Sequence, residues 1–175
     1  RIHRRERIKG FQWVIAGAPG IDKEMYGQAS NAYPSKEGLF VVYGETYALL
    51  SHSYAAMVTS GTATLETALF RVPQVVCYYI MCGKVVSWLR SLVLKVEYIS
   101  LVNLVANFPL VRELVAHEMR ERELTEELDR LLLDDFYRNR MFDEYDKMVI
   151  APLGEPGASE HTAEKMVELL MGTKR

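Results

Sequence analysis

The sequence lacks the features that would assign it to metal-binding, nucleic-acid-binding or membrane-spanning proteins. It has only two cysteines, Cys77 and Cys82, with no CxxC pair and no clustered histidines, which argues against a metal site. The net charge is −2 and the pI is about 6.1, so no basic field is present for a nucleic acid. The longest uncharged apolar run, residues 72–83, is far shorter than the roughly 20 residues that span a bilayer.

The beginning of the sequence carries no signal-peptide pattern. We therefore expect a reduced, cytoplasmic chain that is soluble or peripheral to a membrane and that uses no cofactor. The sequence begins at Arg1 without a methionine and passes almost at once into a strand-like run. This start leads us to expect a fragment of a longer protein.

What the sequence does contain is an alternation of apolar runs and helical patterns. Its 175 residues suit one domain, residues 1–175, and a hydrophobic content of 49% supports a core. Continuous apolar runs that alternate with helices are typical of a parallel sheet covered on both faces. We predict an α/β, Rossmann-like fold with a helical C-terminal part. Its strands should span residues 11–16, 39–43, 55–59 and 74–79, with a short last strand at 98–101.

Helices are predicted between these strands. Asp22 should cap a helix that ends near residue 29, and Thr46 should cap one over residues 47–52. The third helix should span residues 63–70. Residues 83–95 form an amphipathic pattern that contains Trp88, and this helix either packs on the domain or lies in a membrane interface.

The remainder of the chain, from Pro109 onward, has a helical pattern. A break at residues 152–157 should precede a final helix over residues 160–171, capped by Ser159. The charged residues between the apolar positions are interpreted as solvated faces. Three apolar residues are expected to face inward: Leu110, Leu114 and Val115. The apolar residues that recur at helical spacing are Leu124, Leu128, Leu131, Leu132, Phe136, Tyr137, Met141 and Tyr145.

Residues 54–69, YAAMVTSGTATLETAL, hold the most informative pattern. A short apolar strand ends in a turn, and a helical pattern follows. The first N–H groups of that helix favour an anion, and Gly61 lets a ligand approach the backbone. Ser60 and Thr62 are natural N-caps that could also donate to a phosphate, while Glu66 could accept from a sugar hydroxyl. The alternative is an ordinary capped turn of a βα unit.

The loops at the carboxyl ends of the predicted strands suit a nucleotide. Doubly wound sheets bind their ligands outside this edge, and the turn around Gly61 lies on it. Backbone groups of Tyr43 and Gly44, after the second strand, could contact the edge of a base. The turn formed by Ser60, Gly61 and Thr62 could then hold a diphosphate, with Glu66 on the ribose.

Four stretches in order give the chain a resemblance to one enzyme family. The segment SGTATLETAL with VPQVV, residues 60–76, resembles the donor-nucleotide signature of the lipid-A-disaccharide synthases, which are GT-B glycosyltransferases. Three further stretches follow in the same order as in that family, and together they cover nearly the whole chain: VEYISLVNLVA at 96–106, VRELV at 111–115 and GEPGASE at 154–160.

The resemblance implies a fold, a reaction and partners. It implies the C-terminal, donor-binding half of a GT-B fold, with the acceptor-binding N-terminal domain and its catalytic groups absent. The implied reaction joins UDP-2,3-diacylglucosamine to 2,3-diacylglucosamine 1-phosphate and releases UDP, without a metal ion. The whole enzyme would work at the cytoplasmic face of the inner membrane, as a peripheral protein. The partners implied are this donor, the lipid monosaccharide 1-phosphate acceptor and the membrane surface, and no nucleic acid.

The resemblance also implies roles for single residues. Glu66 would bind the ribose, and Asn103 matches the family asparagine that faces the donor nucleotide. From the residues alone, Asn103 could equally form an Asx-type turn at a strand end. Where the family usually has an arginine after this asparagine, the present chain has Phe108, so a phosphate contact would need another cation, for which Lys84 is a candidate.

Three other interpretations stay open. The chain could be a non-catalytic nucleotide-sugar-binding module or resemble UDP-N-acetylglucosamine 2-epimerase, although the YISLVNL and GEPGAS stretches favour the synthase family. Residues 110–145 could form a helical interaction surface. A homodimer could form by exchange of the C-terminal helices between two chains. His52 lacks a nearby acidic partner, and none of the histidines is assigned a catalytic role.

Overall fold

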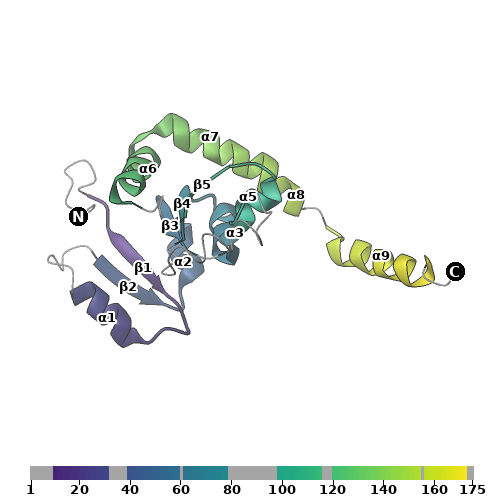
Figure 1. Cartoon of the computed structure of the whole chain (residues 1–175), viewed down its shortest axis with the longest axis horizontal. Coiled ribbons are helices and arrows are strands. Elements are labelled where there is room, and N and C mark those ends of the chain that lie inside the picture. Colours follow the sequence, from purple (N-terminus) through teal and green to yellow (C-terminus); the bar gives the residue numbers. More distant parts are fainter. Residues whose placement is uncertain are drawn as a thin grey trace, which may run out of the picture.

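The computed structural model describes residues 10–31, 39–59, 61–78, 98–115, 120–154 and 156–172. Within these residues, five strands alternate with helices along the chain (Figure 1). Ser60 and Lys84, as well as the helix predicted over residues 83–95, lie outside the described residues. No helix in the described part of the chain has the length and the hydropathy that a membrane span requires.

The described strands are all parallel and form two hydrogen-bonded sheets. In the first sheet, β1 (Trp13–Gly17) pairs with β2 (Leu39–Tyr43). The second sheet has the order β3 (Ala56–Val58), β4 (Gln74–Tyr78) and β5 (Arg112–Val115). The predicted parallel α/β architecture is therefore confirmed, although one continuous sheet was expected and the described strands divide between two.

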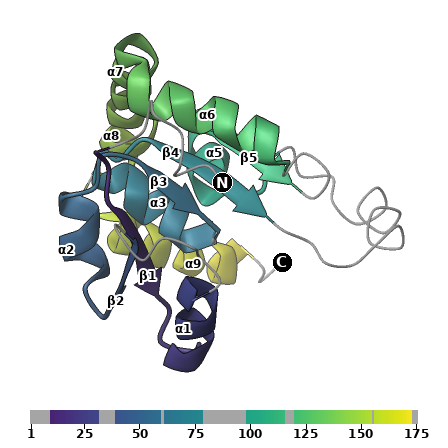
Figure 2. The ribbon, with the colours of Figure 1, turned by 90° about the vertical axis from the view of Figure 1, so that its left-hand side faces the viewer.

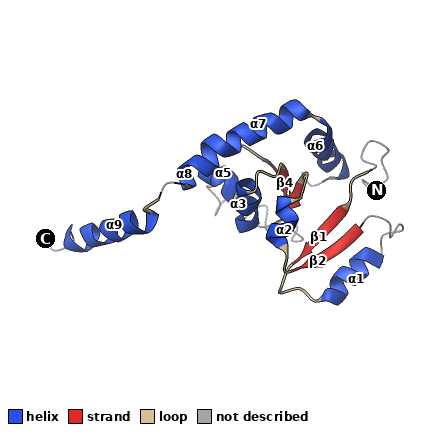
Figure 3. Cartoon of the chain, turned by 180° about the vertical axis from the view of Figure 1, so that it is seen from behind, coloured by secondary structure: helices blue, strands red, loops and turns tan. Residues whose placement is uncertain are grey.

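The helices lie around these sheets. Figures 1 and 3 show α3 and α5 on one side of the second sheet and α6 on the other, while α9 projects away from the body of the domain. Figure 2 shows α6 lying above β4 and β5. The bounds are α1 Lys23–Asn31, α2 Thr46–Ser51, α3 Gly61–Leu69, α5 Leu101–Ala106, α6 Glu121–Leu133, α7 Asp135–Tyr145, the π-helix η4 Asp146–Ile150, α8 Ala151–Leu153 and α9 Ala158–Gly172.

The hydrophobic core is centred on β4. Its first four residues are all buried, because α3 and α6 cover the two faces of this central strand. Leu114 of β5, Leu131 of α6 and Tyr145 of α7 are each no more than 1% exposed and belong to the same cluster. Most of the apolar positions predicted at helical spacing in the C-terminal helices are buried, whereas Phe136, which lies in α7, is 81% exposed.

The largest error concerns the order of strand and helix between residues 98 and 115. The predicted strand at 98–101 is wrong, because Ser100 is the N-cap of α5 and its side chain accepts from the backbone N–H of Asn103. The helix predicted from Pro109 is also wrong there, because residues 112–115 form β5 and pair with β4. The burial predicted for Leu110, Leu114 and Val115 is nevertheless confirmed.

Two predicted caps also differ from the structure. Thr46 is the first residue of α2, and the N-cap position is Glu45, whose side chain makes no capping hydrogen bond. Ser159 lies inside α9 rather than before it. Asp134 is exposed, as expected of a surface residue, and it is also the N-cap of α7, where it accepts from the N–H of Tyr137 at 2.9 Å.

Candidate functional site

The carboxyl ends of β1 and β2 form the first part of the candidate site. The two strands are in register, so that Gly17 lies opposite Tyr43. A Cβ atom at Gly17 would overlap the ring of Tyr43, so this close packing requires glycine. Tyr43 also makes an edge contact with Tyr26, with ring centroids 5.7 Å apart. Gly44 follows with a φ of 75°, which turns the chain away at the end of the strand.

The N-terminus of α3 forms the second part. The helix begins at Gly61, directly after β3 and the undescribed Ser60, and Thr62 is exposed in its first turn. Apart from Gly61's chain neighbours, the nearest described atom to a Cβ built on Gly61 is Cγ of Leu101 in α5, at 4.0 Å. This is an ordinary van der Waals distance. A side chain at Gly61 would therefore meet little steric hindrance from the described residues, and the first N–H groups of α3 carry the partial positive charge of a helix N-terminus.

Glu66 lies in the second turn of α3, on the side that faces α2. Its Oε1 atom accepts from the hydroxyl of Tyr47 at 3.4 Å, and the carboxylate is partly exposed. The Tyr47 ring in turn stacks on Phe70, with centroids 5.5 Å apart. One long hydrogen bond leaves acceptor capacity on the carboxylate for a ligand hydroxyl. Tyr47 was not predicted from the sequence, since it contacts a residue that lies 19 positions further along the chain in another helix.

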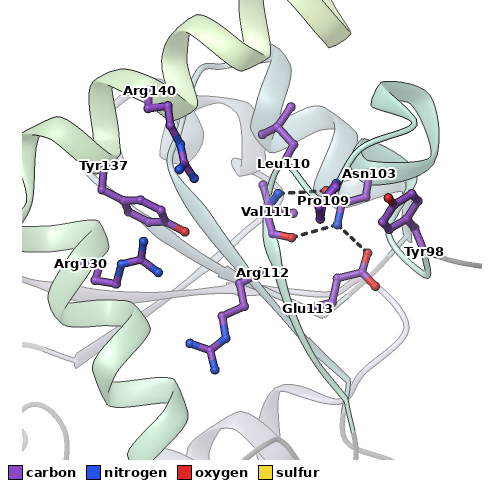
Figure 4. A pocket seen from close by; sticks show the side chains of 10 residues that line it. All are labelled: Tyr98, Asn103, Pro109, Leu110, Val111, Arg112, Glu113, Arg130, Tyr137 and Arg140. Atoms are coloured by element: carbon purple, nitrogen blue, oxygen red, sulfur yellow. Dashed lines mark hydrogen bonds between the residues drawn. The ribbon is translucent and has the colours of Figure 1, made fainter.

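Asn103 is buried, and its side chain is held by other parts of the protein (Figure 4). Its Oδ1 accepts from the Val111 N–H at 2.9 Å, while its Nδ2 donates to the Val111 carbonyl at 2.9 Å and to Glu113 Oε1 at 3.0 Å. Both amide hydrogens are therefore engaged. Asn103 ties the start of α5 to the start of β5, and its predicted contact with a donor nucleotide stays a prediction.

Glu113 was not predicted as an organising residue, although it holds the N-terminus of α5. Its carboxylate accepts from the N–H groups of Ile99 and Ser100 at 3.0 and 2.9 Å and from the Ser100 hydroxyl at 2.6 Å. A carboxylate at this position stabilises the unpaired N–H groups of a helix end. No local sequence signal could identify it, because the partners lie 13 or 14 residues apart.

Most of the predicted site residues lie at the carboxyl ends of strands, with Tyr43 and Gly44 in the first sheet and Gly61 and Thr62 after β3 of the second. Tyr43, Gly44, Gly61 and Thr62 all follow or end parallel strands, and Glu66 lies one turn further along α3. Asn103 instead points toward Val111 and Glu113. Phe108, which stands where a family arginine was expected, is 40% exposed. The start of α3 therefore offers backbone N–H donors and, one turn further on, one carboxylate acceptor, which are groups that can bind a phosphate and a sugar hydroxyl.

The chain is similar to proteins of one kind over most of its length. A family model described as lipid-A-disaccharide synthetase matches residues 5–160. Three curated relatives carry the name lipid-A-disaccharide synthase. The relative from Myxococcus xanthus (strain DK1622) is 36% identical, covering 92% of this chain and 41% of the relative. The relative from Anaeromyxobacter dehalogenans (strain 2CP-C) is 32% identical over 91% of this chain. The relative from Chromohalobacter salexigens is 30% identical over 95% of this chain. The chain spans about 40% of the length of these relatives.

Proposed function

Since this chain belongs to the lipid-A-disaccharide synthetase family, we propose that it is the donor-nucleotide-binding half of a lipid-A-disaccharide synthase. In this proposal the complete enzyme transfers the sugar of UDP-2,3-diacylglucosamine to 2,3-diacylglucosamine 1-phosphate. The products are the lipid A disaccharide 1-phosphate and UDP. The groups that activate the acceptor would belong to the part of the enzyme that this chain does not contain.

The observation that carries the proposal is the position of Glu66 beside the N-terminus of α3. The N–H groups that begin at Gly61 would hold the diphosphate, and the helix dipole would stabilise the negative charge that develops on UDP as it leaves. Glu66 would accept from the ribose hydroxyls, with Tyr47 holding the carboxylate at 3.4 Å. Tyr43 and Gly44 would contact the uracil edge through their backbone groups.

The acyl chains of both substrates lead us to propose further that the complete enzyme works at the cytoplasmic face of the inner membrane as a peripheral protein. The apolar side chains of α9 are compatible with a second proposal, a homodimer in which C-terminal helices are exchanged. Sedimentation equilibrium of the chain would test the homodimer separately from nucleotide binding, since a single species at the monomer mass of 20.0 kDa would contradict it.

The test of the donor site is calorimetric titration of the chain with UDP. We expect saturable binding in the millimolar range or tighter, and an affinity at least fivefold lower for Glu66→Ala, because the ribose loses a charged acceptor. Glu164→Ala is the matched control, since Glu164 lies exposed in α9 and its loss should leave binding unchanged. Absence of UDP binding at millimolar concentration, or an unchanged affinity in Glu66→Ala, would contradict the assignment.

A further inference from the structure

A pocket lies at the amino end of β5, and Asn103 is among the residues that line it. Its volume is about 290 Å³. Arg112, the first residue of β5, pairs with Val75, which is the second residue of β4, so the pocket adjoins the starts of these parallel strands. The turn at Gly61 follows the end of β3 instead. The start of β5 in this pocket and the turn at Gly61 are therefore at opposite ends of the strands, although Asn103, which is predicted to face the donor nucleotide, also lines the pocket.

Three arginines from three different elements line this pocket. Arg112 comes from β5, Arg130 from α6 and Arg140 from α7. Figure 4 shows Arg140 above and Arg130 below the ring of Tyr137, with Arg112 extending from the strand beside them. The side chains of the three arginines are 40%, 47% and 50% exposed, so a ligand from solvent can reach their guanidinium groups.

One buried carboxylate serves two of these arginines. The Glu127 side chain is fully buried, and its Oε2 lies 3.5 Å from Nη1 of Arg112 and 3.3 Å from Nη1 of Arg130. Its Oε1 accepts from the Tyr137 hydroxyl at 2.6 Å. Burial and the neighbouring Glu127 raise the pKa of Tyr137, so the hydroxyl keeps its proton and continues to donate. Glu127 is thus fully engaged, while each guanidinium uses only one of its nitrogen atoms on this carboxylate.

Arg140 has a weaker partner. Its Nε lies 3.4 Å from Oε1 of Glu144 on the same helix, a pair that is half-exposed on the arginine side. The guanidinium carbons of Arg130 and Arg140 lie 3.8 and 5.2 Å from the centroid of the Tyr137 ring, so the ring helps to fix both groups. Glu113 also lines the pocket, but its oxygens accept from Ile99, Ser100 and Asn103.

We propose that this pocket binds a phosphate group, held by the guanidinium groups of Arg112, Arg130 and Arg140. Arginine presents paired N–H donors that match phosphate oxygens, and positioning by Tyr137 and Glu127 lowers the entropy lost on binding. The volume is at the lower end of the range for ligand pockets, which suits a phosphate or diphosphate group rather than a whole nucleotide sugar. The phosphate is either a free anion or part of a lipid headgroup.

Titration of the chain with inorganic pyrophosphate, followed by two-dimensional amide NMR, tests this site directly. We expect saturable shifts at the amides of Val111, Arg112 and Tyr137, with a dissociation constant that rises about tenfold in Arg140→Gln. Arg140 is the residue to change, because its partner Glu144 is not fully buried. Replacing Arg112 or Arg130 would instead remove a positive charge that offsets the negative charge of the buried Glu127 carboxylate. Binding of pyrophosphate near Gly61 would shift different amides and would not respond to Arg140→Gln.

The matched control is Arg122→Gln. Arg122 lies on α6, is 82% exposed and pairs with Glu126, so this variant removes the same charge outside the pocket. We expect less than a twofold change in its affinity for pyrophosphate. Equal weakening of binding by Arg140→Gln and Arg122→Gln would show that the pocket is not a phosphate site. So would the absence of amide shifts around Arg112 in wild type at 10 mM pyrophosphate, which is roughly ten times a weak dissociation constant of 1 mM.

Vesicles distinguish the two sources of the phosphate. Sedimentation with vesicles of phosphatidylglycerol is compared with sedimentation with phosphatidylcholine, for wild type and Arg140→Gln. A lipid headgroup is the source if the chain binds the anionic vesicles, if pyrophosphate competes with this binding, and if Arg140→Gln weakens it. Pyrophosphate shifts at the pocket without such vesicle binding identify a free anion, and both results support the site.

Discussion

Replacing Asn103 by alanine separates a structural role of this residue from a role in nucleotide binding. The side chain makes three hydrogen bonds at 2.9 to 3.0 Å, two of them to the backbone N–H and C=O of Val111. Val111 is 1% exposed, so water cannot easily replace the lost partners. Each buried group that loses its partner costs about 1–3 kcal/mol, and together they should lower the free energy of unfolding by about 3–5 kcal/mol. This is a large part of the roughly 5–15 kcal/mol typical of a domain.

Urea unfolding followed by circular dichroism measures the loss. With a slope of about 2 kcal/mol per molar urea, the midpoint should fall by about 2 M. Asn103→Asp should be at least as unstable, because an ionised aspartate cannot donate to Val111 and would lie beside the carboxylate of Glu113. Asn139→Ala, at an exposed position of α7, is the control and should stay within about 0.7 kcal/mol of wild type.

The same variants decide between the two roles of Asn103. An unfolding free energy within about 0.5 kcal/mol of wild type would refute the structural reasoning. If such a stable Asn103→Ala protein also lost its affinity for UDP, the contact with the donor nucleotide would explain the residue instead. A destabilised variant that binds UDP normally below its unfolding transition would establish that the hydrogen bonds to Val111 are the main function of Asn103.

Three further predictions follow from single contacts. Tyr47→Phe should lower the affinity for UDP two- to threefold but leave that for 2′-deoxy-UDP nearly unchanged, because Tyr47 positions the Glu66 carboxylate for the ribose; an equal loss for both ligands would contradict this role. Gly17→Ala should lower the free energy of unfolding by about 1–3 kcal/mol, measured with urea, because the added Cβ displaces the Tyr43 ring. Burial raises the pKa of the Cys77 thiol from 9.0 to about 11. The unfolded chain therefore releases this proton at a lower pH than the folded chain. The contribution of Cys77 to the free energy of unfolding should be constant well below pH 9 and fall by up to about 1.4 kcal/mol per pH unit between pH 9 and 11. Urea unfolding at pH 8, 9 and 10 should show this decline in wild type and a smaller one in Cys77→Ala.

The first four strands were predictable because their sequences leave little choice. Residues 39–43, LFVVY, are a short run of apolar and β-branched residues, and β2 has these bounds in the structure. In β4 the first four residues are buried, so the continuous apolar run correctly indicated a central strand. The turn at Gly61 was identified for a similar reason, since an apolar run, a glycine and a helical pattern follow one another directly.

The segment around β5 was not predictable in the same way. Residues 110–115, LVRELV, have apolar residues at positions 1, 2, 5 and 6, a spacing that fits one face of a helix. They form a strand because β4 offers a free edge with which Arg112 to Val115 pair in register. The hydrogen bonds between Asn103 and Val111 fix where that strand begins. These contacts join distant residues, which local periodicity does not detect.

Buried polar side chains stabilise the amino edge of the second sheet. At the amino edge, Gln74 Nε2 donates to the Thr64 carbonyl at 2.9 Å and to the Tyr145 hydroxyl at 3.2 Å, while Asn103 and Glu127 hold the start of β5. Each of these three polar side chains is at most 1% exposed, so its contacts are costly to break. At the carboxyl edge, α3 begins at Gly61, and its first N–H groups carry the partial positive charge of a helix N-terminus. These three side chains thus stabilise the amino edge, whereas the nucleotide site that we propose at the carboxyl edge would use the backbone N–H groups of α3.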